Sequence, residues 1–322
     1  NTPSTRDFYR LKSVSGVIEP GKNILLLAPP GHGSSSLLKM LTTTLPITTG
    51  ELYYNNNTLP EISAQHADIR KLCAYQDQVD RQLSFLTAFE SVEFFSQMSS
   101  VHGNDPVRIN SIIDALGLTE CKEVLTERQS GGQRRRVGTS IPLSSDASLL
   151  CLDHWTDGLD SAVCLTVARY LLDLTRAKGI SVISALQTPP PELFFSHDEL
   201  ILLSEGQIVY QGPTCDVHYW LESIGFRCPS DVDTCDFIIE VLSHPRNALS
   251  NLKLKSMREE ELAHQSATQS TSQRSPFPSS HRTQVETSLG LLQFSNQPLT
   301  TTEEMVEFFT TTPFHHHLQS KM

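Results

Sequence analysis

Four short, mainly apolar segments, separated by helix-like stretches, constrain the fold of this chain more than any other feature. They cover residues 24–27, 149–152, 181–184 and 200–203, and each has the length of a buried strand. Strands that alternate with helices build a parallel sheet, because each helix returns the chain to the edge where the previous strand began. We therefore predict an α/β domain with a mainly parallel sheet over residues 1–250.

The other segments differ in character from these runs. Residues 85–145 mix polar and apolar residues with helical spacing, so we predict an inserted helical subdomain there. Residues 251–300 include a stretch made mostly of Ser, Thr, Gln, His, Arg and Pro, which predicts a disordered linker. Residues 301–322 form an amphipathic segment whose apolar side is predicted to carry Met305, Phe308 and Phe309.

Composition excludes some classes of function. The net charge of −11 argues against nucleic acid as a partner, because backbone phosphates require clustered Lys and Arg. No run approaches the ~18–20 consecutive apolar residues of a transmembrane helix. The seven cysteines are irregularly spaced and form no CxxC pair, which is typical of reduced thiols rather than of a zinc site.

A glycine-rich loop follows the first apolar run and precedes a helix predicted over residues 36–45. Its sequence, Ala-Pro-Pro-Gly-His-Gly-Ser-Ser-Ser from position 28, is typical of a P-loop, in which backbone N–H groups surround phosphates at the positive end of a helix. The usual pattern has Gly at position 28 and Lys at position 34, where this chain has Ala28 and Ser34. The candidate nucleotide-binding residues are Pro30, Gly31, His32, Gly33, Ser34, Ser35 and Ser36.

A second set of motifs follows in a fixed order. The loop Ser130, Gly131, Gly132 and Gln133 precedes a basic run, and Asp153 closes an apolar run twenty residues after Gln133. An acidic residue that closes a buried strand opposite a P-loop is a usual partner of magnesium. The turn Gly-Leu-Asp-Ser at positions 158–161, which contains Asp160, comes next.

In this order, the motifs resemble the nucleotide-binding domain of ABC transporters, and in particular the G subfamily of pleiotropic-drug-resistance type. Residues 130–133 are similar to the signature loop, 149–153 to Walker B and 158–161 to the D-loop, while Gln78 matches the Q-loop. Residues 203–213 and 225–229 also resemble segments of that subfamily. The resemblance extends over roughly residues 10–250.

The resemblance implies an ABC-type P-loop NTPase fold, with an antiparallel β edge beside the parallel core and an inserted helical subdomain. It implies that ATP binds together with Mg²⁺, with Ser35, Gln78 and Asp153 around the metal. It also implies two kinds of partner, a second nucleotide-binding domain and transmembrane domains. The domain is then expected to be membrane-associated, on the cytoplasmic face.

Three departures from the family pattern concern ATP hydrolysis. Ser34 stands at the P-loop lysine, His154 at the catalytic glutamate and Leu186 at the switch histidine. Loss of the lysine removes a charged hydrogen bond worth ~1.5–3 kcal/mol, and loss of a general base lowers a rate by ~10²–10⁴. We therefore expect a site that binds ATP with little or no hydrolysis, in a chain whose signature loop is intact and serves a second domain.

Several alternatives stay open at this stage. His32 and His154 are candidates to replace the lost groups, since imidazole accepts protons and carries charge at low pH. Phe8 or Tyr9 is a candidate to stack on adenine, although either residue is equally well explained as core. The whole chain also fits a decayed scaffold that binds no nucleotide, and less well a non-transport ABC ATPase or another P-loop enzyme.

Overall fold

The computed structural model describes residues 10–65, 69–79, 82–99, 105–252 and 298–321. It divides the chain into two compact units, Asn1–Cys215 and Asp216–Met322. Phe8, Tyr9 and residues 253–297 of the predicted linker lie outside the described residues. The predicted domain boundaries at residues 250 and 300 therefore stay predictions.

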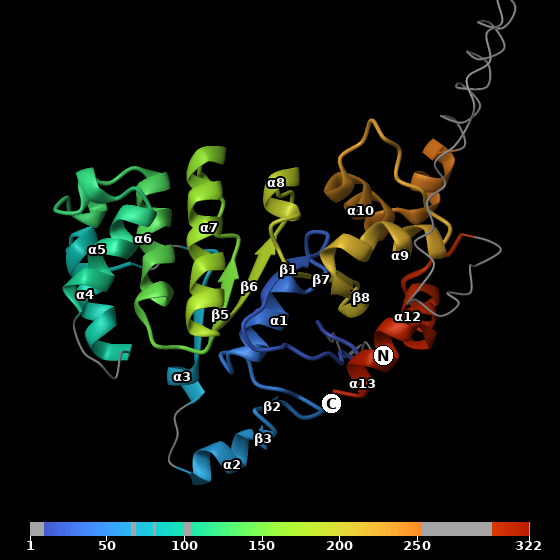
Figure 1. The fold of residues 1–322 in the computed structure, drawn as a ribbon, viewed down its shortest axis with the longest axis horizontal. Coiled ribbons are helices and arrows are strands. Elements are labelled where there is room, and N and C mark those ends of the chain that lie inside the picture. Colours follow the sequence, from blue (N-terminus) through green and yellow to red (C-terminus); the bar gives the residue numbers. More distant parts are fainter. Residues whose placement is uncertain (1–9, 66–68, 80–81, 100–104, 253–297, 322) are drawn as a thin grey trace, which may run out of the picture. The chain divides into compact units, whose positions relative to one another are not determined.

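A six-stranded sheet forms the centre of the first unit, with the order β4-β5-β6-β1-β7-β8 (Figure 1). Its strands are β1 (Asn23–Leu27), β4 (Cys73–Gln76), β5 (Leu149–Asp153), β6 (Ser181–Leu186), β7 (Glu199–Ser204) and β8 (Gln207–Pro213). The first five in this sheet order are parallel, and β8 pairs antiparallel with β7 at the edge. The predicted mainly parallel sheet with an antiparallel edge is thus confirmed.

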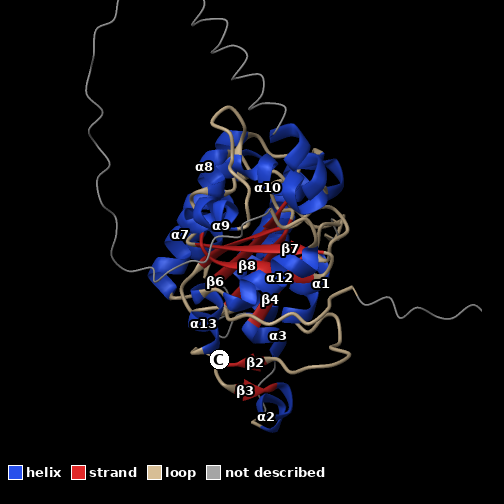
Figure 2. Ribbon diagram, turned by 90° about the vertical axis from the view of Figure 1, so that its right-hand side faces the viewer, coloured by secondary structure: helices blue, strands red, loops and turns tan. Residues whose placement is uncertain are grey.

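Helices cover both faces of the sheet, because the connections between strands run toward opposite edges. From β1 the chain passes through α1 (Ser34–Leu41) to the far edge strand β4, whereas α7 (Ser161–Lys178) leads back from β5 to β6. Because right-handed crossovers in opposite directions lie on opposite faces, α1 and α7 are separated by the sheet (Figure 2). The short helix α8 (Pro191–Phe194) packs beside α7.

Helix α1 starts two residues before the predicted position and ends four residues before the predicted end. Gly33 has φ 108°, a left-handed conformation that glycine adopts without strain, so the helix begins directly at Ser34. At the other end Thr43 has φ 56°, a left-handed conformation that stops the helix, and the hydroxyl of Thr42 donates to the carbonyl of Leu38 at 3.0 Å.

The segment between β4 and β5 is helical where the structure describes it. It contains α4 (Ala88–Ser99), α5 (Pro106–Ala115) and α6 (Gly131–Ser144), which lie together beside the β4 end of the sheet (Figure 1). Between β1 and β4 lie the smaller elements β2 (Tyr53–Tyr54), β3 (Asn57–Thr58), α2 (Leu59–Ala64) and α3 (Ile69–Leu72).

The second unit is helical in its described part. Its helices are α9 (Val217–Ser223), α10 (Thr234–Ser243), α12 (Thr302–Thr311) and α13 (Pro313–Gln319). In α12, Met305 and Phe309 are buried and Phe308 is half-buried, and the ring of Phe309 lies 5.5 Å from that of His315 in α13. Among the described residues, no helix is both long enough and apolar enough to span a bilayer.

Candidate functional site

The glycine-rich loop occupies the turn between β1 and α1. The N–H of His32 donates to the carbonyl of Pro29 at 3.1 Å, which folds the loop over the end of the strand. A Cβ atom at Gly33 would lie 3.0 Å from the carbonyl oxygen of Arg10, so a side chain there would collide with this segment. Ser34 and Ser35 are half-buried in the first turn of α1, where helix N–H groups favour an anion.

His32 is fastened to the turn between β7 and β8. Its Nδ1 accepts the N–H of Glu205 at 3.1 Å, and its carbonyl oxygen accepts the N–H of Gly206 at 3.0 Å. Burial lowers the pKa of His32, against a smaller raising effect of Glu205. The ring is therefore neutral near pH 7 and does not provide the positive charge that Ser34 lacks.

Asp153 lies at the carboxyl end of β5 with its side chain almost completely buried. The hydroxyl of Tyr75 donates to its Oδ2 at 2.9 Å, whereas Oδ1 has no hydrogen-bond partner among the described residues. Burial, and then the neighbouring Asp153 carboxylate, raise the pKa of Tyr75, so the phenol keeps its proton and donates. A buried carboxylate oxygen without a hydrogen-bond partner is chemically suited to bind a metal ion such as Mg²⁺.

His154 follows Asp153 in the chain, and Leu186 ends β6 beside β1. His154 has φ 51°, and its Nε2 lies 3.7 Å from Asp153 Oδ1, beyond hydrogen-bond distance. Leu186 is buried and pairs in register with Leu27 at the end of β1. Its aliphatic side chain has no group that can contact a phosphate.

Gln78 is exposed just after β4, and Arg135 holds its backbone. Nη1 of Arg135 donates to the carbonyl oxygens of Asp77 and Gln78 at 2.9 and 2.8 Å. Nη2 donates to the carbonyl oxygens of Asp153 and His154, each at 2.6 Å. The sequence shows Arg135 only as part of the basic run at positions 134–136, and it predicts neither these hydrogen bonds nor that of Tyr75.

A salt bridge ties α1 to the same region. Lys39 Nζ lies 3.7 Å from Asp77 Oδ1 and 5.6 Å from the centre of the Tyr75 ring. The helix that follows the glycine-rich loop is therefore in contact with the segment that contains Gln78. The predicted residues of the P-loop, Q-loop and Walker B thus come from neighbouring elements at one end of the sheet.

The loop at residues 130–133 forms the N-terminus of α6. The hydroxyl of Ser130 accepts the N–H of Gln133 at 3.2 Å, and the Gln133 side chain accepts the N–H of Ser130 at 2.9 Å. This capping box fixes the first turn, and Ser130 and Gly131 are exposed. Nearby, Asp160 caps α7 by accepting the N–H of Val163 at 2.9 Å.

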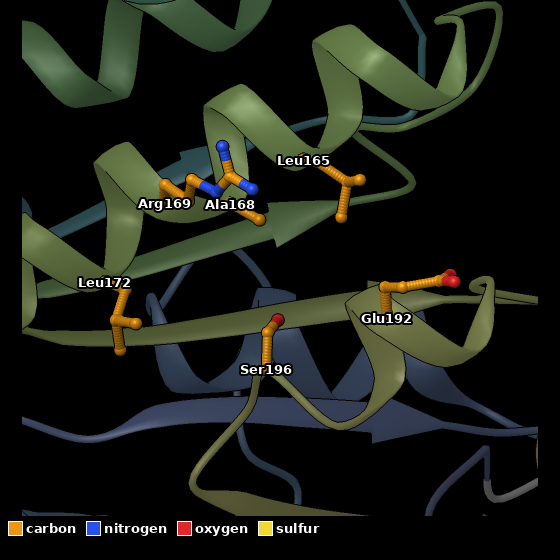
Figure 3. Close-up of a pocket in the computed structure, with 6 residues that line it drawn as sticks. All are labelled: Leu165, Ala168, Arg169, Leu172, Glu192 and Ser196. Atoms are coloured by element: carbon orange, nitrogen blue, oxygen red, sulfur yellow. The ribbon is translucent and has the colours of Figure 1, made fainter.

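Two cavities lie in the first unit. One of about 600 Å³ adjoins the glycine-rich loop through Ser36 and is also lined by Arg10, Leu11, Met40 and residues 45–52. The other, of about 200 Å³, lies between α7 and α8 and contains none of the predicted site residues (Figure 3). Only the first therefore has a size and position suited to part of a nucleotide.

This fold and these loops define an ATP-binding cassette domain of the ABC transporter class. Residues 11–157 match the family model for "ABC transporter". The dimeric post-hydrolysis structure of the ATP-binding cassette MJ0796, bound to ADP and Pi, has a TM-score of 0.58 at 21% identity and covers 66% of this chain and 94% of its own. This likeness confirms the fold.

Curated relatives make the assignment more specific. The chain is 33% identical over 270 residues to ABC transporter G family member 47 of Oryza sativa subsp. japonica, and 32% identical over 277 residues to member 31 of Arabidopsis thaliana. Member 12 of Dictyostelium discoideum is 32% identical over 256 residues. These matches cover 72%, 72% and 74% of this chain but only 19%, 19% and 39% of the relatives. The chain carries an ABC transporter ATP-binding domain that is distantly similar to the G family.

Proposed function

We propose that this chain is the first, degenerate nucleotide-binding domain of a G-family exporter of pleiotropic-drug-resistance type. In this proposal it binds Mg-ATP at its own P-loop with little or no hydrolysis and lends its signature loop to a second nucleotide-binding domain. The observation that carries the proposal is a contrast within one domain. The signature loop is capped and exposed at Ser130 and Gly131, whereas position 34 lacks an ammonium group and position 154 lacks a carboxylate.

Retained ATP binding is supported by the geometry of the loop and of the adjoining cavity. Backbone N–H groups at the start of α1 and the hydroxyl of Ser35 suit phosphates and their magnesium ion, and Asp153 Oδ1 would be a second oxygen ligand of that ion. The cavity beside Ser36 suits adenine and ribose. Its lining residues Arg10 and Leu11 directly follow Phe8 and Tyr9, the candidates for stacking on adenine.

Weak hydrolysis follows from the groups that replace the family's catalytic residues. Ser34 has no charge with which to stabilise the γ-phosphate, and neutral His32 does not restore it. Leu186 offers no hydrogen bond to the γ-phosphate. A metal ion bound at Asp153 would supply charge for holding the phosphates, while Gln78 would contribute its side-chain oxygen.

Partners are proposed from the exposed surfaces. The MJ0796 cassette is dimeric in two solved structures, and a similar head-to-tail pair would place residues 130–133 of this chain on the ATP of the second domain. Phe94 and Met98, 44% and 69% exposed, lie four residues apart on α4 and so share one helical face. We propose that this apolar face contacts the transmembrane domains.

Calorimetric titration of the chain with Mg-ATP, carried into the millimolar range, tests the proposal. We expect saturable binding without release of phosphate. Ser34→Lys restores the charged hydrogen bond and should tighten binding by roughly 10- to 100-fold, whereas Gly131→Ala, distant from the P-loop in sequence, should leave it unchanged. No heat from a folded wild-type chain and a folded Ser34→Lys variant would favour a scaffold that no longer binds nucleotide.

A further inference from the structure

Helix α6 directs one face toward the loops of its own nucleotide site. Gly132, Arg135 and Thr139 are spaced by three and four residues and therefore lie on the same side of the helix. A Cβ atom at Gly132 would lie 2.8 Å from the carbonyl oxygen of Gly158 in the D-loop. Thr139 accepts a hydrogen bond from Gln76 Nε2 at 2.9 Å, at the end of β4. The face thus contacts three segments that belong to the ATP site.

Arg135 makes the most extensive of these contacts. Its guanidinium donates to four backbone carbonyls, two in the Q-loop and two at the end of Walker B. Arg135 is 5% exposed, and a guanidinium stays protonated, so the carbonyl dipoles of both segments help to stabilise a buried positive charge. Displacement of either segment would remove two acceptors from this charge, which is costly in a buried place.

The neighbouring arginines do not share this arrangement. Arg134 Nη1 donates to the carbonyl of Gln129, and Arg136 Nη1 donates to the carbonyls of Leu116 and Gly117 at the end of α5. Arg136 thus also joins α6 to backbone carbonyls, but within the helical segment rather than at the nucleotide site. This makes Arg136 a matched control for Arg135.

We infer that Arg135 is a positioning residue that couples the Q-loop and Walker B of this chain to its own signature helix. The N-terminus of that helix is the loop offered to the second domain, two to five residues before Arg135. A shift of Gln78 or Asp153 on nucleotide binding is therefore passed to residues 130–133 through the side chain of Arg135. Only this last consequence rests on the proposed function, because the coupling itself exists without nucleotide.

Hydrogen exchange of the whole chain without nucleotide tests the coupling, in the wild type and in Arg135→Lys and Arg136→Lys. Lysine keeps the charge but lacks the planar fork that reaches both segments. We expect Arg135→Lys to speed exchange about tenfold or more in residues 77–79 and 153–157 together. Arg136→Lys should affect residues 116–118 instead. Unchanged exchange at the two loops, or the same pattern in both variants, would refute the inference.

Exchange at β1 separates positioning from general stability. If Arg135→Lys also speeds exchange of residues 24–27 equally, Arg135 serves only the stability of the domain and the inference is wrong.

A second experiment repeats the exchange measurement with Mg-ATP. In the wild type we expect protection at residues 31–36 and 130–134, and in Arg135→Lys at 31–36 alone. Lack of protection everywhere in the wild type would contradict nucleotide binding but leave the nucleotide-free result in force, and protection at both sites in the variant would refute the coupling.

Discussion

The two adjacent glycines of the signature loop should respond oppositely to alanine. A Cβ atom at Gly131 meets no other atom within 4 Å, whereas one at Gly132 would lie 2.8 Å from the Gly158 carbonyl. Real Cβ atoms essentially never come within 3.0 Å of another heavy atom, so the backbone of the D-loop or of α6 must move. Neither glycine needs a left-handed conformation, and this contact is therefore the main difference between them.

The magnitude follows from two opposing effects. Replacing a glycine in a helix by alanine stabilises it by roughly 0.5–1 kcal/mol, and both variants gain this amount. Overpacking against a backbone carbonyl costs about 1–3 kcal/mol, and only Gly132→Ala incurs it. For a unit of this size, 1 kcal/mol shifts the melting temperature by roughly 2–4 °C, so Gly132→Ala should melt roughly 2–12 °C below Gly131→Ala.

Thermal unfolding followed by circular dichroism measures this difference, with both variants and the wild type in one buffer. The wild type should melt at or slightly below Gly131→Ala. Equal melting temperatures for the two variants would show that the signature loop and the D-loop do not approach each other closely. That result would refute the contact between Gly132 of α6 and the Gly158 carbonyl.

Three further predictions concern single side chains. Burial lowers the pKa of His197 from 6.5 to about 4, so at pH values between these two the unfolded chain binds more protons than the folded chain. The free energy of unfolding should therefore fall by about 3 kcal/mol as the pH drops through this window. His197→Asn, which can keep the hydrogen bond to the Leu193 carbonyl, should remove this pH dependence in urea titrations at pH 7 and pH 4.5. Tyr75→Phe deprives buried Asp153 of its hydrogen bond and should lower the free energy of unfolding by about 1–3 kcal/mol, and an unchanged urea midpoint would contradict the contact. Asp160→Ala removes the cap of α7 and should cost about 1 kcal/mol in the same titration, while Asp160→Ser should recover most of it.

The parallel core could be predicted from the sequence, because strands and helices leave patterns among residues that are close together along the chain. Short, mainly apolar segments were sufficient to place β1, β5, β6 and β7, since the strands of a parallel sheet are buried on both faces. Strand β4 was not predicted, because its sequence, Cys-Ala-Tyr-Gln, has no Val, Ile or Leu and ends in a polar residue. The predicted start of α1 was two residues late, because sequence alone does not give the φ angle of Gly33.

The residues of the candidate site could also be predicted from the sequence, but the contacts between them could not. The order of the loops indicated the P-loop, signature loop and Walker B, and it identified Ser34 and His154 as departures. His32 accepts a hydrogen bond from the N–H of Glu205, 173 positions away, and Arg135 donates to a carbonyl 58 positions away. Local propensity carries no information on such pairs. Only the order of strands in the sheet brings them together, and so only the tertiary structure assigns a role to Arg135.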